Sequence, residues 1–252
     1  MGEMFCFQCQ QTAKGTGCEG KAGVCGKKAD TANFQDELTG AMIALAAIAK
    51  GKGNKKIDRL LVEGLFTAVT NVNFNSETVR VFTEKVRAAT AALSGGCVGC
   101  AGCGISNEYD MKKLWTDNED IRSLKSLILF GIRGMAAYAY HAMELGFTDT
   151  DVNAFFYEAL SAVGNDTLGM DELLPLVLKT GEINFKCMEL LDRANTQTYG
   201  TPTPVTVPLT IEKGPFIVIS GHDLHDLKLL LEQTKDKGIN IYTHGEMLPA
   251  HG

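Results

Sequence analysis

The chain has 252 residues, with 24 Lys and Arg against 30 Asp and Glu, and a formal net charge of −6. Binding to a phosphate backbone needs clustered excess Lys and Arg, so this balance argues against nucleic acid as the main partner. The most apolar stretches, at 40–49 and 124–143, are too short or are interrupted by charged residues, so we expect no membrane span. The first residues lack the basic and apolar regions of a secretory signal, and we expect a cytoplasmic protein with reduced cysteines.

Half of the eight cysteines lie in the first thirty residues, in a C-x2-C-x8-C-x6-C pattern. They are Cys6, Cys9, Cys18 and Cys25, and their neighbours are mostly polar residues and glycine rather than the apolar residues of a core. Disulfides are typical of smaller secreted domains, and structural zinc usually has two tight cysteine pairs, whereas only the first pair is tight here. A short spacing followed by long glycine-bearing loops favours an iron-sulfur cluster over both alternatives.

The segments CFQCQQTAKGTGC, VCGK and DTANFQD resemble the N-terminus of the hybrid cluster proteins, a family also called prismane proteins or hydroxylamine reductases. The resemblance implies that Cys6, Cys9, Cys18 and Cys25 bind a conventional 4Fe-4S cluster. A related class with a longer middle spacing carries a 2Fe-2S centre instead.

From Asp30 onward the sequence has the periodicity of a helical protein. Asp30 and Thr31 are suitable N-cap residues, and Gly51 and Gly53 end the first apolar run. Helices are predicted over 30–50, 56–70, 76–95, 118–145, 149–162 and 169–194. The short connections between them predict two small helical bundles.

The segment SGGCVGCAGCG places Cys97, Cys100 and Cys103 at C-x2-C-x2-C between the two groups of helices. This is the spacing of the first three ligands of a bacterial ferredoxin motif, but no C-x3-C-P completes it. The triplet is either a metal site or a glycine-rich loop with incidental thiols, and we favour the loop. Cys187 lies on an apolar helical face and is predicted to be a core residue, with a role as a fourth ligand the weaker alternative.

Residues 195–213 contain three of the six prolines and many threonines, which predicts an extended linker. Strands at 216–220 and 239–244 and a helix over 223–235 then predict a βαβ unit with parallel strands. Two such strands do not form a stable sheet alone, so we expect the front part of a longer protein. The predicted fold is mainly α, followed by the start of a Rossmann-like α/β domain. The expected domains are an iron-sulfur segment at 1–30, a helical bundle domain at 31–205 and the βαβ unit at 206–252.

His222 follows the first of these strands and Glu246 the second, so both are expected at the carboxyl edge of the sheet, where α/β proteins bind ligands. By themselves one His and one Glu are weak evidence, and a polar loop in which Asp223 caps the helix is the simpler interpretation. SGHDLHDL and YTHGEMLPAHG, however, resemble family segments in which this His and this Glu bind a hybrid 4Fe-2O-2S cluster. The resemblance therefore implies catalytic and metal-binding roles for His222 and Glu246, with further ligands beyond residue 252. His225, His244 and His251 are weaker candidates.

The activity is implied by the resemblance alone. We expect an iron-sulfur oxidoreductase that reduces hydroxylamine to ammonia and water at the hybrid cluster, with electrons from a redox partner protein arriving through the N-terminal cluster. Imidazole and carboxylate are harder ligands than thiolate, which suits iron that also carries oxygen bridges. Nitric oxide reduction is an alternative activity, and a non-catalytic ferredoxin-like electron-transfer or redox-sensing module is an alternative of another class. Residues 1–252 alone are expected to lack hydroxylamine reductase activity.

Overall fold

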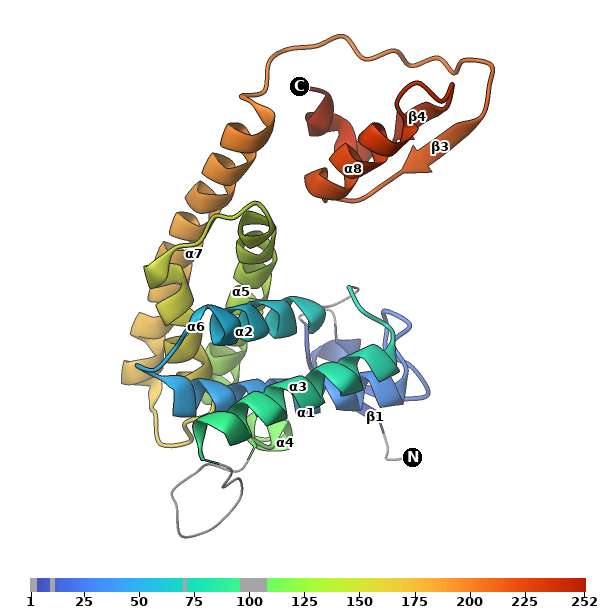
Figure 1. The fold of residues 1–252 in the computed structure, drawn as a ribbon. Coiled ribbons are helices and arrows are strands. Elements are labelled where there is room, and N and C mark those ends of the chain that lie inside the picture. The colour runs from blue at the N-terminus through green and yellow to red at the C-terminus, as the bar shows by residue number, and fades with distance from the viewer. Residues whose placement is uncertain (1–3, 10–11, 70–71, 96–107) are drawn as a thin grey trace. The chain divides into compact units, whose positions relative to one another are not determined.

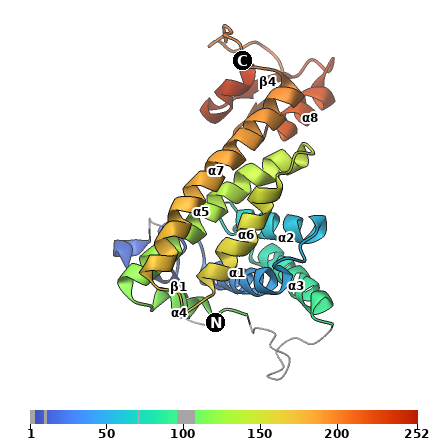
Figure 2. The ribbon, with the colours of Figure 1, turned by 90° about the vertical axis from the view of Figure 1, so that its left-hand side faces the viewer.

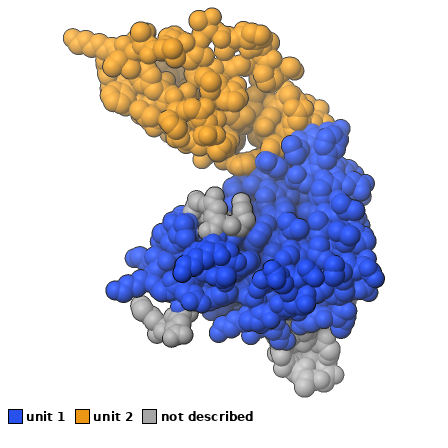
Figure 3. Space-filling model, turned by 180° about the vertical axis from the view of Figure 1, so that it is seen from behind, with its two compact units in different colours: residues 1–140, 148–190 blue, residues 141–147, 191–252 orange. Residues whose placement is uncertain are grey.

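The computed structural model describes residues 4–9, 12–69, 72–95 and 108–252, and most of them are helical (Figure 1). The chain divides into two compact units, Met1–Tyr140 with Thr148–Leu190, and His141–Phe147 with Leu191–Gly252 (Figure 3). The first unit is mainly helical and the second contains a parallel sheet, which confirms the predicted fold class. Within the described ranges, none of the helices combines the length and the apolar character needed to cross a bilayer.

A small hairpin that was not predicted opens the described chain. Its strands β1 (Met4–Cys6) and β2 (Cys18–Gly20) pair antiparallel, with Cys6 opposite Cys18. The hairpin packs on the start of the first helix, where Met4, both cysteines and Ala32 form a buried cluster. Gly17 has a φ of +127°, and a Cβ there would overlap the Phe5 ring, so the turn into β2 needs glycine.

The first group of helices comprises α1 (Ala29–Ala49), α2 (Lys55–Thr67) and α3 (Ser76–Leu93), close to the predicted ranges. The side chains of Asn54 and Asn75 cap α2 and α3. The predicted cap of α1 was wrong, because Lys28 occupies that position and the Asp30 carboxylate accepts from the Thr31 N–H inside the first turn. Much of α1 is buried, since it packs against α3 and against α6 (Thr150–Val163) of the second group.

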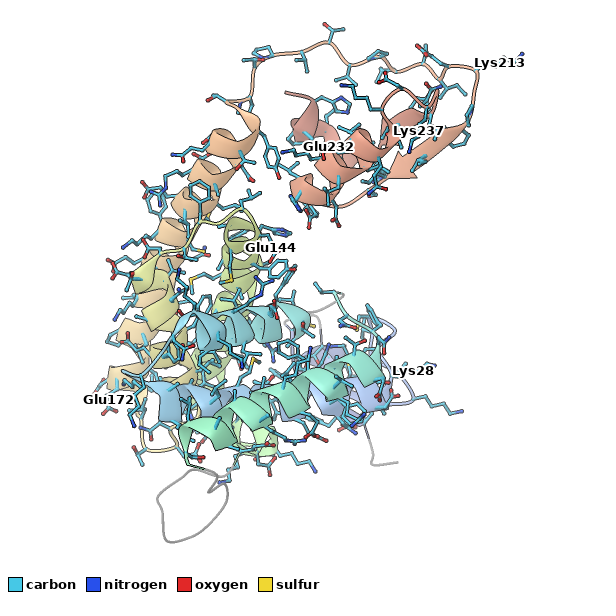
Figure 4. All side chains as sticks on the ribbon, in the orientation of Figure 1. Lys28, Glu144, Glu172, Lys213, Glu232 and Lys237 are labelled. Carbon is cyan, nitrogen blue, oxygen red and sulfur yellow. The ribbon has the colours of Figure 1, made fainter. Side chains whose placement is uncertain are left out.

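The second group comprises α4 (Met111–Trp115), α5 (Glu119–Glu144), α6 (Thr150–Val163) and α7 (Met170–Tyr199), and only the short α4 was not predicted. The views in Figures 1 and 2 show α5 and α7 running together, and the Cys187 thiol donates a hydrogen bond to the Met135 carbonyl across them (3.5 Å). Cys187 is fully buried, as predicted. Glu172 caps the start of α7, because its carboxylate accepts a hydrogen bond from the Gly169 N–H at 2.7 Å (Figure 4).

The C-terminal end of α7 differs from the prediction. The helix continues five residues into the segment expected to be a linker, through residues 195–199. This part contains no proline, and the helix ends before Gly200, which has a φ of +97°. The first proline, Pro202, follows that glycine, so the extended segment begins later than composition indicated.

The second unit contains the predicted βαβ arrangement. Strands β3 (Phe216–Ile219) and β4 (Asn240–Thr243) are parallel and are connected by α8 (Leu224–Thr234). The Asp223 carboxylate caps α8 by accepting from the backbone N–H groups of His225 and Asp226. A 3-10 helix, η2 (Gly245–His251), follows β4 directly and carries Glu246. The carboxyl ends of both strands therefore lead into the predicted site segments.

Candidate metal centres

The four N-terminal cysteines line one small cavity. Cys6 and Cys18 reach it from opposite positions of β1 and β2, whereas Cys9 and Cys25 reach it from the loops that follow these strands. All four are free thiols, so the structure forms no disulfide among them. Thr12, Gly23, Val24 and Lys27 complete the lining of the cavity. The spacing in the sequence thus corresponds to four sulfur donors that converge in space.

The surroundings of these sulfurs favour the thiolate form at Cys18. The Thr12 hydroxyl (3.6 Å) and the Ala13 N–H (3.3 Å) both donate to the Cys18 sulfur. Burial alone would raise the pKa of the Cys18 thiol, but the hydrogen bonds and the nearby Lys27 charge together lower it. At Cys6 burial dominates and raises the pKa. Metals bind the thiolate, so a sulfur with such donors could serve as a metal ligand.

Two buried cations stand beside the cysteines, and sequence reasoning missed both roles. Lys27 lines the cavity itself and is only 1% exposed. Arg133 of α5 donates to the Gln8 carbonyl (3.4 Å) and to the Thr39 hydroxyl (2.8 Å), which ties the Cys6–Cys9 loop to two helices. Burial lowers the pKa of Arg133 to about 10. The one available signal was that Arg133 interrupts the apolar stretch at 124–143.

Gln8 connects the cysteine loop to α1 as well. Its amide donates to the Asp36 carboxylate (2.6 Å) and to the Ala32 carbonyl (3.2 Å). Burial raises the pKa of Asp36 to about 6, against the opposing influence of the Gln8 hydrogen bond and the Arg133 charge. Polar side chains from α1 and α5 therefore fix the loop that carries Cys6 and Cys9.

The predicted site at the strand ends is also brought together. His222 Nε2 and Glu246 Oε2 lie 2.8 Å apart and share a hydrogen bond, although 24 residues separate them in the sequence. Both side chains are exposed. Beside them, His244 Nδ1 lies 3.0 Å from the Ser220 hydroxyl, and His251 Nε2 lies 2.8 Å from the Thr243 hydroxyl. Three separate hydrogen-bonded pairs thus lie on the segments at the carboxyl ends of β3 and β4.

The remaining predicted candidates are Cys187 and the cysteine triplet. Cys187 is a core thiol whose pKa burial raises to about 12, and it lies on α7 rather than beside the hairpin. Cys97, Cys100 and Cys103 lie outside the described residues. Across the ranges that the structure describes, no three His, Cys, Asp or Glu side chains are gathered closely enough to hold a single metal ion.

Comparison with known proteins identifies related sequences. Residues 4–252 match the family model described as the Prismane/CO dehydrogenase family. The chain is 43% identical to a hydroxylamine reductase of Desulfitobacterium hafniense (strain DSM 10664 / DCB-2), over 98% of this chain and 49% of the relative. Hydroxylamine reductases of Methanocella arvoryzae and Solidesulfovibrio magneticus are 44% and 46% identical over 98% and 99% of the chain, and over 50% of each relative. The chain therefore spans about half the length of the curated relatives it matches.

Proposed function

This chain belongs to the Prismane/CO dehydrogenase family, and from that membership we propose that it is part of an iron-sulfur oxidoreductase that reduces hydroxylamine to ammonia and water. Relatives named hydroxylamine reductase, at 42–46% identity, support the choice of substrate. The observation that carries the proposal is the single cavity lined by Cys6, Cys9, Cys18 and Cys25.

The proposed ligands of a 4Fe-4S cluster are these four cysteines. The residues fit such a group because four sulfur donors face one cavity, and because N–H and O–H groups donate to the Cys18 sulfur. When bound, the cluster would supply one-electron transfer between a redox partner protein and the substrate site. Hydrogen bonds from Thr12 and the Ala13 backbone favour the thiolate form of Cys18, and Arg133 and Gln8 hold the neighbouring loop in place.

We assign the substrate site to the strand ends, with His222 and Glu246 as ligands of a hybrid 4Fe-2O-2S cluster. Nitrogen and carboxylate donors suit iron that also carries oxygen better than thiolates do. The hydrogen bond between the two side chains orients both toward the same side of the sheet edge.

The balanced reaction consumes two electrons and two protons for each hydroxylamine that is converted into ammonia and water. His244 and His251 are held by the Ser220 and Thr243 hydroxyls next to this site, so their imidazoles can hold protons close to the substrate. The two imidazoles are therefore the proposed source of protons at the substrate site.

The first test measures iron in the 252-residue chain prepared without oxygen and with ample iron. We expect about four irons per chain and a broad visible absorption that bleaches on reduction. Cys9→Ser should lose much of both, because it removes one of four converging donors. Cys187→Ala is the matched control and should retain them, since Cys187 lies in the core. Full iron and absorption in Cys9→Ser would contradict the assignment, and zinc without iron would favour a structural zinc site.

A further inference from the structure

Lys27 is held in a fixed position at the wall of the cysteine cavity. It follows Cys25 in the loop between β2 and α1, and its carbonyl accepts a hydrogen bond from the Gly23 N–H (2.8 Å). Its ammonium group donates to the side-chain carbonyl of Gln35, which is itself fully buried. The Gln35 amide in turn donates to the Asn73 carbonyl (3.2 Å). The chain of hydrogen bonds places one positive charge beside the sulfurs.

The direct hydrogen-bond partner of this buried charge is a neutral amide. An ammonium group away from water is costly unless a negative group compensates it. Its hydrogen-bond partner Gln35 is neutral, and among the described residues no carboxylate lies within ion-pair distance of Lys27, although its charge also acts on the Asp36 carboxyl. The groups that share its cavity and can become negative are the four thiols.

We propose that Lys27 is the counter-charge of the iron-sulfur cluster and raises its reduction potential, an inference that rests on the cluster proposed above. A cluster held by four thiolates is anionic, and reduction adds one electron while no bond forms or breaks. A nearby positive charge therefore stabilises the reduced form more than the oxidised form. Burial strengthens this effect, because little water lies near the buried charges to screen their interaction.

The neighbouring lysine provides a matched control. Lys28 is the next residue in the chain and carries the same charge, but its side chain is exposed at the start of α1 (Figure 4). Lys28 does not line the cavity. Solvent and salt screen an exposed charge, so Lys28 should influence the reduction potential little.

The experiment is an anaerobic redox titration of the iron-loaded 252-residue chain, followed by visible absorption, with iron measured in every sample. Lys27→Met removes the charge while keeping a long side chain, and it should shift the reduction potential to a lower value. Lys27→Arg keeps the charge and should stay near the unaltered chain. Lys28→Met should leave the potential unchanged.

Each outcome decides between charge and packing. An unchanged potential in fully loaded Lys27→Met would overturn the proposal. Loss of iron in Lys27→Met but not in Lys27→Arg would support the counter-charge, whereas loss in both would assign Lys27 a packing role and overturn it. Absence of iron from the unaltered chain would instead refute the cluster itself, and the role of Lys27 with it.

Discussion

At the scale of single residues, Asp36 couples the cysteine loop to pH. Burial raises the pKa of this carboxyl to about 6, whereas an unfolded Asp titrates near 4, so the folded chain binds a proton over roughly pH 4–6 that the unfolded chain has lost. The contribution of the protonated Asp36 carboxyl to the free energy of unfolding is fully present below about pH 4, and it is lost as the pH rises through about 6.

Asp36→Asn imitates the protonated carboxyl and should abolish this pH dependence. The variant should gain stability relative to the unaltered chain between pH 4 and pH 8. The gain should be about 1 to 2 kcal/mol, less than the full shift implies because the side chain is partly exposed. Urea unfolding of the metal-free, reduced chains at both pH values measures the difference. A stability difference that does not change with pH would contradict this account of Asp36.

The cysteine triplet allows a second prediction at this scale. If Cys97, Cys100 and Cys103 are incidental, replacing all three with Ser should leave the iron content, the visible spectrum and the helical circular dichroism unchanged. Loss of a separate set of cluster signals in electron paramagnetic resonance would show that the triplet binds a second cluster.

The sequence predicted some site residues and missed others for a physical reason. The spacing of the cysteines predicted convergence, and strand ends predicted that His222 and Glu246 would meet, because both patterns are local or follow from parallel pairing. The contact between Arg133 and Gln8 spans 125 residues and depends on how α5 packs, which no local pattern encodes. Lys27 resembled any other lysine in a polar loop until its burial was known.

At the scale of elements, the long helices were predicted closely because caps and apolar periodicity agree in them. The strands β1 and β2 have three residues each, too few to show an alternating pattern, and α4 has only five. At the end of α7 the prediction relied on threonine and proline content, but the helix stops only where Gly200 takes a left-handed conformation. Composition thus predicted that an extended segment is present, but not the residue at which it begins.

Exposed apolar side chains on the parallel pair β3–β4 indicate that the chain self-associates. Phe216 and Val218 are 63% and 61% exposed, although parallel sheets are normally covered on both faces. We expect the 252-residue chain to self-associate with increasing concentration, and Val218→Lys to weaken that association several-fold because it places a charge on the strand. Sedimentation velocity measures the effect. Leu209→Lys is the control, since Leu209 is 98% exposed but lies outside the sheet. A chain that stays monomeric at high concentration would contradict the prediction.

At the scale of the whole molecule, the chain contributes two sites that belong to different units. The cysteine cavity lies in the helical unit and the His222–Glu246 pair in the unit with the sheet. We propose that the functional division follows 1–30, 31–205 and 206–252, with electrons entering at the first segment and leaving at the last. Because the chain spans about half of its relatives, we propose that the full-length protein supplies the remaining ligands of the substrate site.

The most direct test of this account is hydroxylamine-dependent oxidation of a reduced viologen dye by the full-length protein. His222→Ala and Glu246→Ala should each abolish turnover while leaving the absorption of the N-terminal cluster intact, because each removes a ligand from the substrate site only. His225→Ala is the matched control, since only the backbone of His225 takes part in the α8 cap, and it should keep most of the activity. Residues 1–252 alone should show no turnover. Full activity in the protein that lacks both His222 and Glu246, or robust turnover by the 252-residue chain, would contradict the mechanism.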